Sequence, residues 1–260
     1  MNLDLEFKIS KAAEIIQSSK FVVALTGAGI STESGIPDFR SPGTGLWTKK
    51  DPMKYASLDA FLQNPSAYWE RALDPDGLGN KILDAKPSKA HLCIAELEQL
   101  GYLRSVITQN IDNLHQKAGN SDVIELHGTI YTAHCMDCGT KYERKKVLGW
   151  IKNGELPPRC KKDGCNGILK SDTILFGEQL DPNTLRKAVD MAKSADCMLV
   201  LGSSLVVTPA AHLPFLTIQN GGKLIIINLQ ETPHDINANL IIREKIGNIM
   251  PKILEKLKKL

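Results

Sequence analysis

The sequence predicts an α/β fold in which helices cover both faces of a doubly wound parallel sheet. Short apolar runs recur without alternation, as expected of strands that are buried on both faces. They lie at Phe21–Leu25, Leu103–Thr108, Val123–Leu126, Cys197–Leu201, Leu224–Asn228 and Leu240–Ile242. Helical patterns separate them, and this alternation is typical of a parallel α/β sheet. Two segments, 41–85 and 131–170, break the alternation and are predicted to be insertions.

The composition is that of an ordinary globular protein. The chain has 260 residues, 42% of them apolar, which is enough for one large domain or for a large and a small one. The net charge of +3 is too small to indicate nucleic-acid binding. No apolar run approaches the ~20 residues of a membrane span. Residues 1–20 form an amphipathic helical pattern without a signal-peptide core, so we expect a cytoplasmic protein.

Helices are predicted from their end signals and from apolar spacing. Ser88–Leu100 places apolar side chains on one face and stops at a glycine. Asp181 is a cap that is followed by proline at the first helical position, and this helix should run to about Ser194. Pro209 opens another helix, which ends near Gly221. The Lys-rich C-terminal tail is predicted to be the solvated side of a terminal helix.

A glycine-rich turn follows the first predicted strand and should lead into a helix. Gly27 and Gly29 match the first two glycines of the dinucleotide fingerprint, but Thr32 stands where the third belongs. Glycines let the backbone approach a phosphate, and a helix N-terminus favours its charge. A turn that merely needs glycine would look the same. Phe39 and Arg40 follow, and they suit a ligand with a flat base and negative charge.

Polar side chains follow two further strands. Gln109, Asn110 and Asp112 come just past the strand that ends at Thr108, and His127 follows the next strand. Open α/β sheets bind ligands at the carboxyl ends of their strands. A histidine there is a candidate general base near neutral pH. Taken alone, the amides are more typical of loop capping, and a single histidine is more often structural.

Four of the six cysteines form a cluster with metal-ligand spacing. Cys135 and Cys138 are followed, after 21 residues, by Cys160 and Cys165. Two such pairs form a tetrahedral thiolate cage, although four residues rather than two separate the second pair. Four protein ligands leave no open position, so the expected metal is a structural zinc that folds this segment. The alternative is a set of free thiols.

Together these motifs resemble a known family. GAGIS and GIPDFR lie at 27–40, TQNIDNLHQKAG at 108–119, ELHG at 125–128, FGE at 176–178 and GSSLVV at 202–207. With the four cysteines, they follow the order seen in sirtuins, the NAD-dependent protein lysine deacylases. The motifs span most of the chain. The resemblance implies a Rossmann-like NAD-binding domain (1–40, 86–130 and 171–260), a cofactor loop with a helical insertion (41–85) and a zinc-ribbon module (131–170).

The resemblance also implies a reaction and its residues. NAD is consumed as a co-substrate, and the products are nicotinamide, O-acyl-ADP-ribose and deacylated lysine. His127 is the implied base, and Asn110 and Asp112 shape the nicotinamide pocket. The implied NAD contacts are Gly27, Ala28, Gly29, Ile30, Ser31, Pro37, Asp38, Phe39, Arg40, Gln109, Asn110, Ile111, Asp112, His127, Gly202, Ser203, Ser204, Asn228, Leu229, Gln230 and Ile246.

The substrate peptide is expected to add as a strand between two segments. They are Phe176, Gly177 and Glu178 on one side and Leu205, Val206 and Val207 on the other. The family usually shows Arg-Pro upstream of FGE, whereas this chain reads Leu169-Lys170-Ser171-Asp172, which we interpret as a local change in the return from the zinc module. Residues 41–50 are rich in Pro and Gly and are predicted to form a mobile flap over NAD.

Acyl preference is predicted from the helical stretch around Leu58–Leu73. Sirtuins that prefer acidic acyl groups carry a Tyr-x-x-Arg pair there. Tyr68 and Arg71 have this spacing, but alignment on Trp69 places the family's pair at 73–76, where this chain has two aspartates. We therefore expect neutral acyl groups, acetyl first, with Arg71 solvated.

Two other functions remain open at this point. One is mono-ADP-ribosyl transfer from the same co-substrate, which the intact motifs around Asn110, Asp112 and His127 disfavour. The other is a zinc-containing chromatin or nucleic-acid binding module, suggested by the lysines of residues 141–170. The expected partners are acyl-lysine proteins or peptides, including chromatin-associated ones. Direct nucleic-acid binding and membrane association are not expected.

Overall fold

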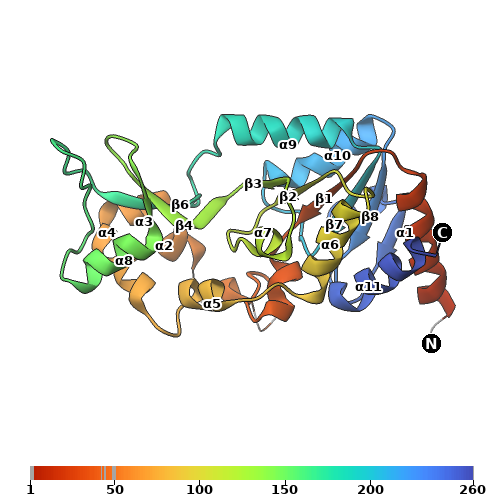
Figure 1. Cartoon of the computed structure of the whole chain (residues 1–260), viewed down its shortest axis with the longest axis horizontal. Coiled ribbons are helices and arrows are strands. Elements are labelled where there is room, and N and C mark those ends of the chain that lie inside the picture. The colour runs from red at the N-terminus through yellow and green to blue at the C-terminus, as the bar shows by residue number, and fades with distance from the viewer. Residues whose placement is uncertain (1–2, 42, 44, 49–50, 260) are drawn as a thin grey trace. The chain divides into compact units, whose positions relative to one another are not determined.

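A computed structural model describes residues 3–41, 43, 45–48 and 51–259 (Figure 1). The chain divides into two compact units. The first contains Met1–Asp38, Lys86–Leu126 and Asp181–Leu260, and the second contains Phe39–Ala85 and His127–Leu180. The second unit thus holds both segments that interrupt the alternation of strands and helices. Within the part of the chain that is described, no helix is long and apolar enough to cross a membrane.

The first unit is built on a six-stranded parallel sheet, as predicted. Its strand order is β3-β2-β1-β7-β8-β9. The strands are β1 (Val22–Thr26), β2 (Ser105–Thr108), β3 (Val123–Glu125), β7 (Cys197–Leu201), β8 (Lys223–Ile227) and β9 (Leu240–Ile242). Every residue of β1, β2 and β7 is buried, which explains why these runs do not alternate. Thr26 pairs with Thr108 and with Leu201, so the carboxyl ends of these three strands are level.

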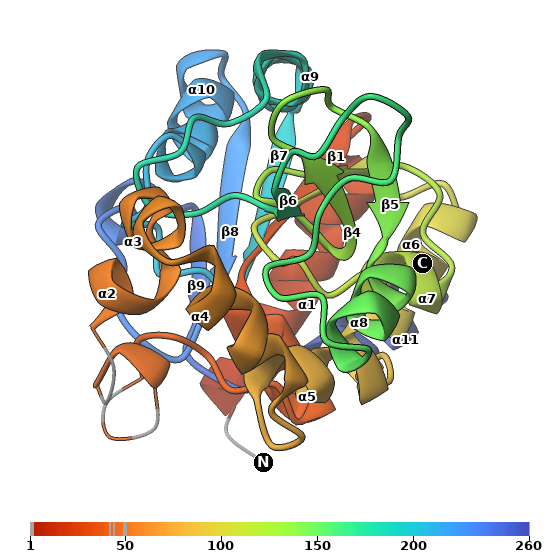
Figure 2. The same ribbon diagram turned by 90° about the vertical axis from the view of Figure 1, so that its left-hand side faces the viewer.

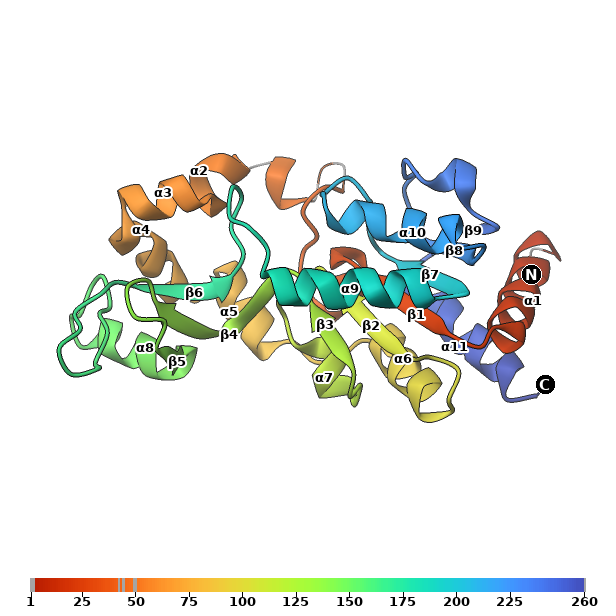
Figure 3. The ribbon, with the colours of Figure 1, turned by 90° about the horizontal axis from the view of Figure 1, so that it is seen from above.

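Helices cover both faces of this sheet (Figures 1 and 3). On one face, α1 (Leu3–Ser18), α6 (Lys89–Gln99) and α11 (Ile246–Leu257) pack together, and Ile9, Ile94 and Ile253 join their core. On the other face lie α9 (Pro182–Ser194) and α10 (Leu213–Gln219). The short α7 (Leu114–Ala118) contacts α6. Two layers of helices around a parallel sheet confirm the doubly wound fold.

The helix ends follow the predicted chemistry at α6, which Ser88 caps, and at α9, and they depart from it in two other places. Asp181 caps α9 by accepting the N–H of Thr184 at 2.8 Å, as its position before proline predicts. The glycine turn after β1 leads into a 3₁₀ helix, Ala28–Ser34, rather than an α-helix. After Pro209 the chain first forms a 3₁₀ turn, and α10 begins only at Leu213. Pro214 explains the late start, because its missing N–H suits the first turn of a helix.

The second unit contains a small antiparallel sheet with strand order β5-β4-β6 (Figure 2). Its strands are β4 (Gly128–Cys135), β5 (Lys141–Glu143) and β6 (Leu169–Thr173). The amphipathic α8 (Arg144–Lys152) packs against β4 and β5 and buries Val147 and Ile151. The cysteine-bearing segment is therefore a folded part of this unit.

In its described residues, the helical insertion of the second unit contains four short α-helices. They are α2 (Pro52–Ala56), α3 (Leu58–Gln63), α4 (Pro65–Glu70) and α5 (Leu78–Asp84). The single helical stretch predicted around Leu58–Leu73 is broken at Asn64, because Asn64 caps α4 and the following proline starts it. Trp69 is fully buried and donates its indole N–H to the Leu169 carbonyl at 2.7 Å. This bond ties α4 to the antiparallel sheet.

Candidate functional site

The turns after β1 and β7 are in direct backbone contact. The N–H of Gly29 donates to the carbonyl of Gly202 at 2.9 Å, and that of Gly27 donates to Leu201 at 3.1 Å. A Cβ on Gly29 would lie 2.6 Å from the Gly202 Cα, and one on Gly202 would lie 2.5 Å from the Ile30 nitrogen. Glycine is thus required here by the packing of two turns. The sequence left open whether Gly27 and Gly29 serve phosphate approach or the turn itself, and it gave no packing reason for Gly202.

The loops after β1 and β2 meet in a buried polar cluster. The Ser31 hydroxyl donates to Asp112 Oδ2 at 2.7 Å. Asn110 donates its amide to the Ser31 oxygen and to the Gly27 carbonyl, both at 3.1 Å. All three side chains are less than a tenth exposed. The structure therefore brings together residues that lie about eighty positions apart and were predicted from separate motifs.

Asp112 organises its own loop as well. Its second oxygen accepts the N–H of Leu114 at 2.9 Å, and Asn113 between them adopts a left-handed φ of 58°. Burial raises the pKa of Asp112, and the hydrogen bond from Ser31 opposes that rise. A carboxylate held this way fixes the direction of the hydroxyl and amide groups around it.

The loop after β2 also reaches the loop after β7. The Gln109 side-chain amide donates to the Ser203 hydroxyl oxygen at 2.7 Å, and its backbone N–H donates to Thr26 at 2.9 Å. Ser203 in turn accepts the N–H of Leu205 at 3.3 Å. Together with the Ser31 cluster, these contacts collect predicted residues at the carboxyl ends of β1, β2 and β7, where open sheets bind ligands.

A fourth group of predicted residues follows β8. The Asn228 N–H donates to Ile242 at 3.2 Å, and its side chain donates to the Gln230 carbonyl at 2.8 Å. Arg243 donates to the Asn228 carbonyl at 3.1 Å and forms an ion pair with Asp235. Sequence reasoning missed Arg243, since nothing local marks an arginine after an edge strand as a support for its neighbour.

In the second unit, three aromatic rings form a small stack. The ring of Phe39 stacks on Trp47 at 5.2 Å, and Trp47 meets the edge of Phe176 at 6.0 Å. Arg40 is exposed, and partial desolvation lowers the pKa of its guanidinium. Of the predicted flap at 41–50, residues 42, 44, 49 and 50 lie outside the described residues, and 46–48 form a 3₁₀ turn.

His127 is held through its backbone at the start of the second unit. Its carbonyl accepts the N–H of Ile174 at 2.9 Å, and its side chain is half-buried. The next residue, Gly128, has a φ of 69°, and a Cβ there would lie 1.9 Å from the Asp172 carbonyl oxygen. The glycine is therefore needed to bring this segment against β6.

The predicted peptide-binding segment at Phe176–Glu178 is a tight turn. The N–H of Phe176 donates to Ala56 at 2.8 Å, and its carbonyl accepts the N–H of Leu58 at 2.9 Å. Gly177 has a φ of 81°, and the Glu178 N–H closes the turn on the Leu175 carbonyl at 3.0 Å. The N–H and the C=O of Phe176 are therefore both hydrogen-bonded to the helical insertion. Strand addition of the substrate peptide at this segment stays a prediction.

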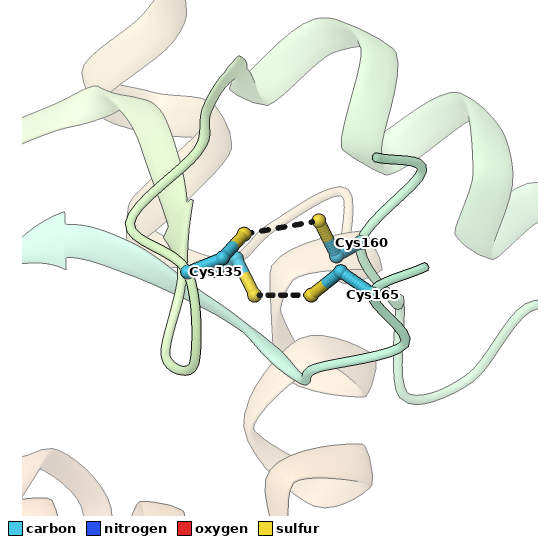
Figure 4. A group of neighbouring side chains, drawn as sticks. Cys135, Cys160 and Cys165 are labelled. Atoms are coloured by element: carbon cyan, nitrogen blue, oxygen red, sulfur yellow. Dashed lines mark hydrogen bonds between the residues drawn. The ribbon is translucent and has the colours of Figure 1, made fainter. Parts of the chain in front are cut away.

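The four cysteines meet in one cluster of the second unit (Figure 4). All four sulfurs lie within 4.8 Å of one another, with Cys135–Cys165 and Cys138–Cys160 each at 3.6 Å. None is in a disulfide. A tetrahedral zinc with Zn–S bonds of about 2.3 Å requires sulfurs about 3.8 Å apart. The donor set and spacing therefore fit a structural zinc.

Comparison with known proteins identifies the family. The model of the Sir2 family matches residues 27–209, which is more than half of the chain. The chain belongs to the Sir2 family. Among the relatives of this sirtuin, the NAD-dependent protein deacetylase of Caldivirga maquilingensis is 47% identical over 95% of this chain and 93% of its own. The NAD-dependent protein deacylase 2 of Archaeoglobus fulgidus is 45% identical over 98% of each chain.

Solved Sir2 structures share the fold of this sirtuin. One, described as Sir2–p53 peptide–NAD+, has a TM-score of 0.87 and 39% identity and covers 97% of this chain and 100% of its own. Another, described as a Sir2 variant with deacetylated p53 peptide and 3′-O-acetyl-ADP-ribose, has a TM-score of 0.86 and 40% identity. It covers 96% of this chain and 98% of its own.

A buried histidine pair in this sirtuin was not predicted from the sequence. His91 and His115 pack edge to face with ring centroids 4.8 Å apart, and His115 Nε2 lies 2.9 Å from the Thr26 hydroxyl. Burial lowers the pKa of His91 to about 3 and that of His115 to about 4. Both rings are therefore neutral at physiological pH. The only sequence signal was the place of His115 within the TQNIDNLH motif.

Proposed function

We propose that this sirtuin is an NAD-dependent protein lysine deacylase that yields nicotinamide, O-acyl-ADP-ribose and free lysine. The proposal rests on the buried cluster of Ser31, Asn110 and Asp112 at the carboxyl ends of β1 and β2. The names of its relatives, NAD-dependent protein deacetylase and deacylase, support the same activity. So do the NAD and acetyl-ADP-ribose in the descriptions of its Sir2 neighbours.

The first unit supplies groups that suit a dinucleotide. The turn at Gly27–Ser31 is proposed to bind the pyrophosphate, and Gln109 and Ser203 the adjoining ribose. Asn110 and Asp112 orient the carboxamide of nicotinamide, because a fixed amide and carboxylate offer both a donor and an acceptor. Asn228 and Gln230 are proposed to reach the adenosine. Bound NAD supplies the ribose carbon from which nicotinamide departs.

The remaining roles rest on the family motifs. His127 is proposed as the base that takes a proton from the ribose hydroxyl. Phe39 and Arg40 are proposed to line the reacting face. Gly177 and Val206 are proposed to hold the peptide main chain from the two segments that contain them. The zinc is structural, because four thiolates leave no position for water or substrate.

The proposed substrates are acyl-lysine proteins of the cytoplasm, chromatin-associated ones included. Neither nucleic acid nor a membrane is among the proposed partners. Mono-ADP-ribosyl transfer is the competing reaction. The residues of the Ser31–Asn110–Asp112 cluster disfavour it because they belong to the intact family motifs.

One assay tests the proposal. An acetyl-lysine peptide is incubated with the protein with and without NAD, and all products are identified by mass. Deacetylated peptide, nicotinamide and O-acetyl-ADP-ribose in equal amounts are expected only with NAD. Deacetylation without NAD, or ADP-ribose attached to protein in place of deacetylation, would overturn it. Binding of DNA that weakens steeply with salt, without any turnover, would support the binding-module alternative.

A further inference from the structure

Lys170 on β6 is a lysine whose charged end is buried. Its side chain is 1% exposed, and lysine is almost never buried to this extent unless it is paired. The ammonium donates to the carbonyls of Ser171 at 2.9 Å and Thr173 at 2.8 Å, and it forms an ion pair with Glu178 Oε2 at 2.9 Å. An ammonium has three N–H donors, and all three are satisfied here.

Glu178 links this ion pair to the tight turn that it closes. The same Oε2 atom accepts the N–H of Leu175 at 2.9 Å, while the Glu178 N–H donates to the Leu175 carbonyl. The turn is thus closed twice, once by the backbone and once by the carboxylate. Gly177 lies inside the closed turn, and its φ of 81° suits the third position of a type II turn.

A second anchor holds the other side of the turn. Phe176 exchanges hydrogen bonds with Ala56 and Leu58 of the helical insertion. The main chain of Gly177 is therefore set between Phe176, which is fixed by the insertion, and Glu178, which is fixed by Lys170. Within the described residues, neither the N–H nor the C=O of Gly177 forms a hydrogen bond.

We propose that Lys170 is a positioning residue for the acyl-lysine peptide. Its buried ammonium fixes the Glu178 carboxylate, and the carboxylate in turn sets the direction of the Gly177 peptide groups that meet the substrate main chain. Lys170 itself does not touch the substrate. The inference rests on the proposed function, because that function assigns the peptide to this turn.

Removing the ammonium should loosen the turn without dismantling the unit. Glu178 is 20% exposed and can turn toward water once its partner is gone, which releases the Leu175 N–H. The Phe176 anchor and the zinc cluster remain. Removing the ammonium should therefore weaken peptide binding, because strand addition depends on main-chain groups held in a fixed direction.

The test compares Lys170→Met with Lys170→Arg and with Lys152→Met, an exposed lysine of the same unit. In Lys170→Met we expect the peptide KM to rise about tenfold, while kcat at saturating peptide and the KM for NAD stay within about threefold. Amide exchange at Leu175 and Glu178 should also quicken. Lys170→Arg should recover most of the peptide affinity, and Lys152→Met should match the parent protein.

Either of two results for Lys170→Met would overturn the inference. One is a Lys170→Met protein that folds and retains zinc but has an unchanged peptide KM. The other is an equal rise in the KM values for peptide and NAD, which would indicate general damage. If Lys170→Met does not fold, Glu178→Gln removes the same ion pair at nearly constant volume, and an unchanged peptide KM in that variant would also refute the inference. Failure of the proposed function differs from both, because the parent protein itself would then not deacylate.

Discussion

The hydroxyl of Ser31, in the turn after β1, donates a 2.7 Å hydrogen bond to the carboxylate of Asp112, in the loop after β2. Both side chains are buried, so neither group has water as a substitute partner. This contact joins the two motifs on which NAD binding is proposed to depend. It also offers a small substitution with a definite expected effect.

We expect Ser31→Ala to lower kcat/KM for NAD by about ten- to a hundredfold and to lower the free energy of unfolding by about 1–2 kcal/mol, because a buried carboxylate loses a donor. Ser34→Ala in the same 3₁₀ helix is the control. The Ser34 hydroxyl is buried and no described residue forms a hydrogen bond with it, so its loss should cost no stability. Steady-state kinetics and urea unfolding measure both quantities. Equal behaviour of the two variants would contradict the role of the Ser31–Asp112 bond.

Replacing His127 by alanine should abolish deacylation and leave NAD binding and the fold largely intact. Loss of a general base alone typically costs about 10²–10⁴-fold in rate. The carbonyl of His127, rather than its ring, bonds Ile174, so the local backbone should survive the change. Single-turnover kinetics, with the exposed His212→Ala as control, measure the effect. Activity within about threefold of the parent would exclude His127 as the base.

The protein should contain one zinc per chain, and the metal should come off only with loss of structure. The four sulfurs of the cysteine cluster lie within 4.8 Å of one another only because the segment is folded, so binding of zinc and folding of this segment are coupled. Metal analysis and thermal melting of the parent and of Cys160→Ser provide the measurement. Zinc-free protein with full activity and an unchanged melting temperature would be incompatible with a structural zinc.

Acid should destabilise the fold through His91 and His115. Their folded pKa values of about 3 and about 4 lie below the ordinary 6.5, so the unfolded chain binds these protons first as the pH falls. The free energy of unfolding should therefore decrease below about pH 6.5, by up to about 1.4 kcal/mol per pH unit for each histidine. Asp112, whose pKa is raised, has the opposite sign.

Urea unfolding between pH 4 and 7 checks this slope in the parent and in His91→Asn. The variant should show a shallower slope, because it lacks one of the two groups that take up a proton on unfolding. A slope that is the same in both proteins would show that His91 does not contribute. His212→Ala, which removes an exposed histidine, should leave the slope unchanged.

Acetyl-lysine should be preferred over succinyl-lysine. The guanidinium of Arg71 lies over the rings of Tyr55 at 5.6 Å and Tyr68 at 6.0 Å, and it donates to the Tyr55 carbonyl at 3.3 Å. These contacts hold Arg71 at an exposed position, as the sequence predicted. Values of kcat/KM on matched acetyl-, myristoyl- and succinyl-lysine peptides test the preference. A higher succinyl value that disappears in Arg71→Met would show that Arg71 binds the acyl carboxylate.

Much of the fold could be predicted because its signals are local. Strands such as Cys197–Leu201 appear as unbroken apolar runs since both faces are covered. The start of α9 follows from Asp181 and its proline, whose effects act within one helical turn. The cysteine cluster could be predicted from the sequence because a zinc site requires a fixed number and spacing of ligands.

The motif residues of the site could be found from the sequence, but the reasons for them could not. Gly29 and Gly202 are glycines because two distant turns pack backbone to backbone. The sequence around Lys170 looked like a departure from the family pattern, yet its ammonium meets three acceptors in a buried ion pair. Neither partner set can be seen without the folded chain.

The sequence by itself determined the strands of the parallel sheet, helices such as α6 and α9, the cysteine cluster and the family, because periodicity, capping and ligand spacing act between near neighbours. Only the tertiary structure decided that the glycine turn leads into a 3₁₀ helix, that Ser31 meets Asp112, that Gln109 meets Ser203 and that Lys170 holds Glu178. These features depend on hydrogen bonds that contribute to stability because they are buried. Burial is created when distant segments pack, so it leaves no local pattern in the sequence.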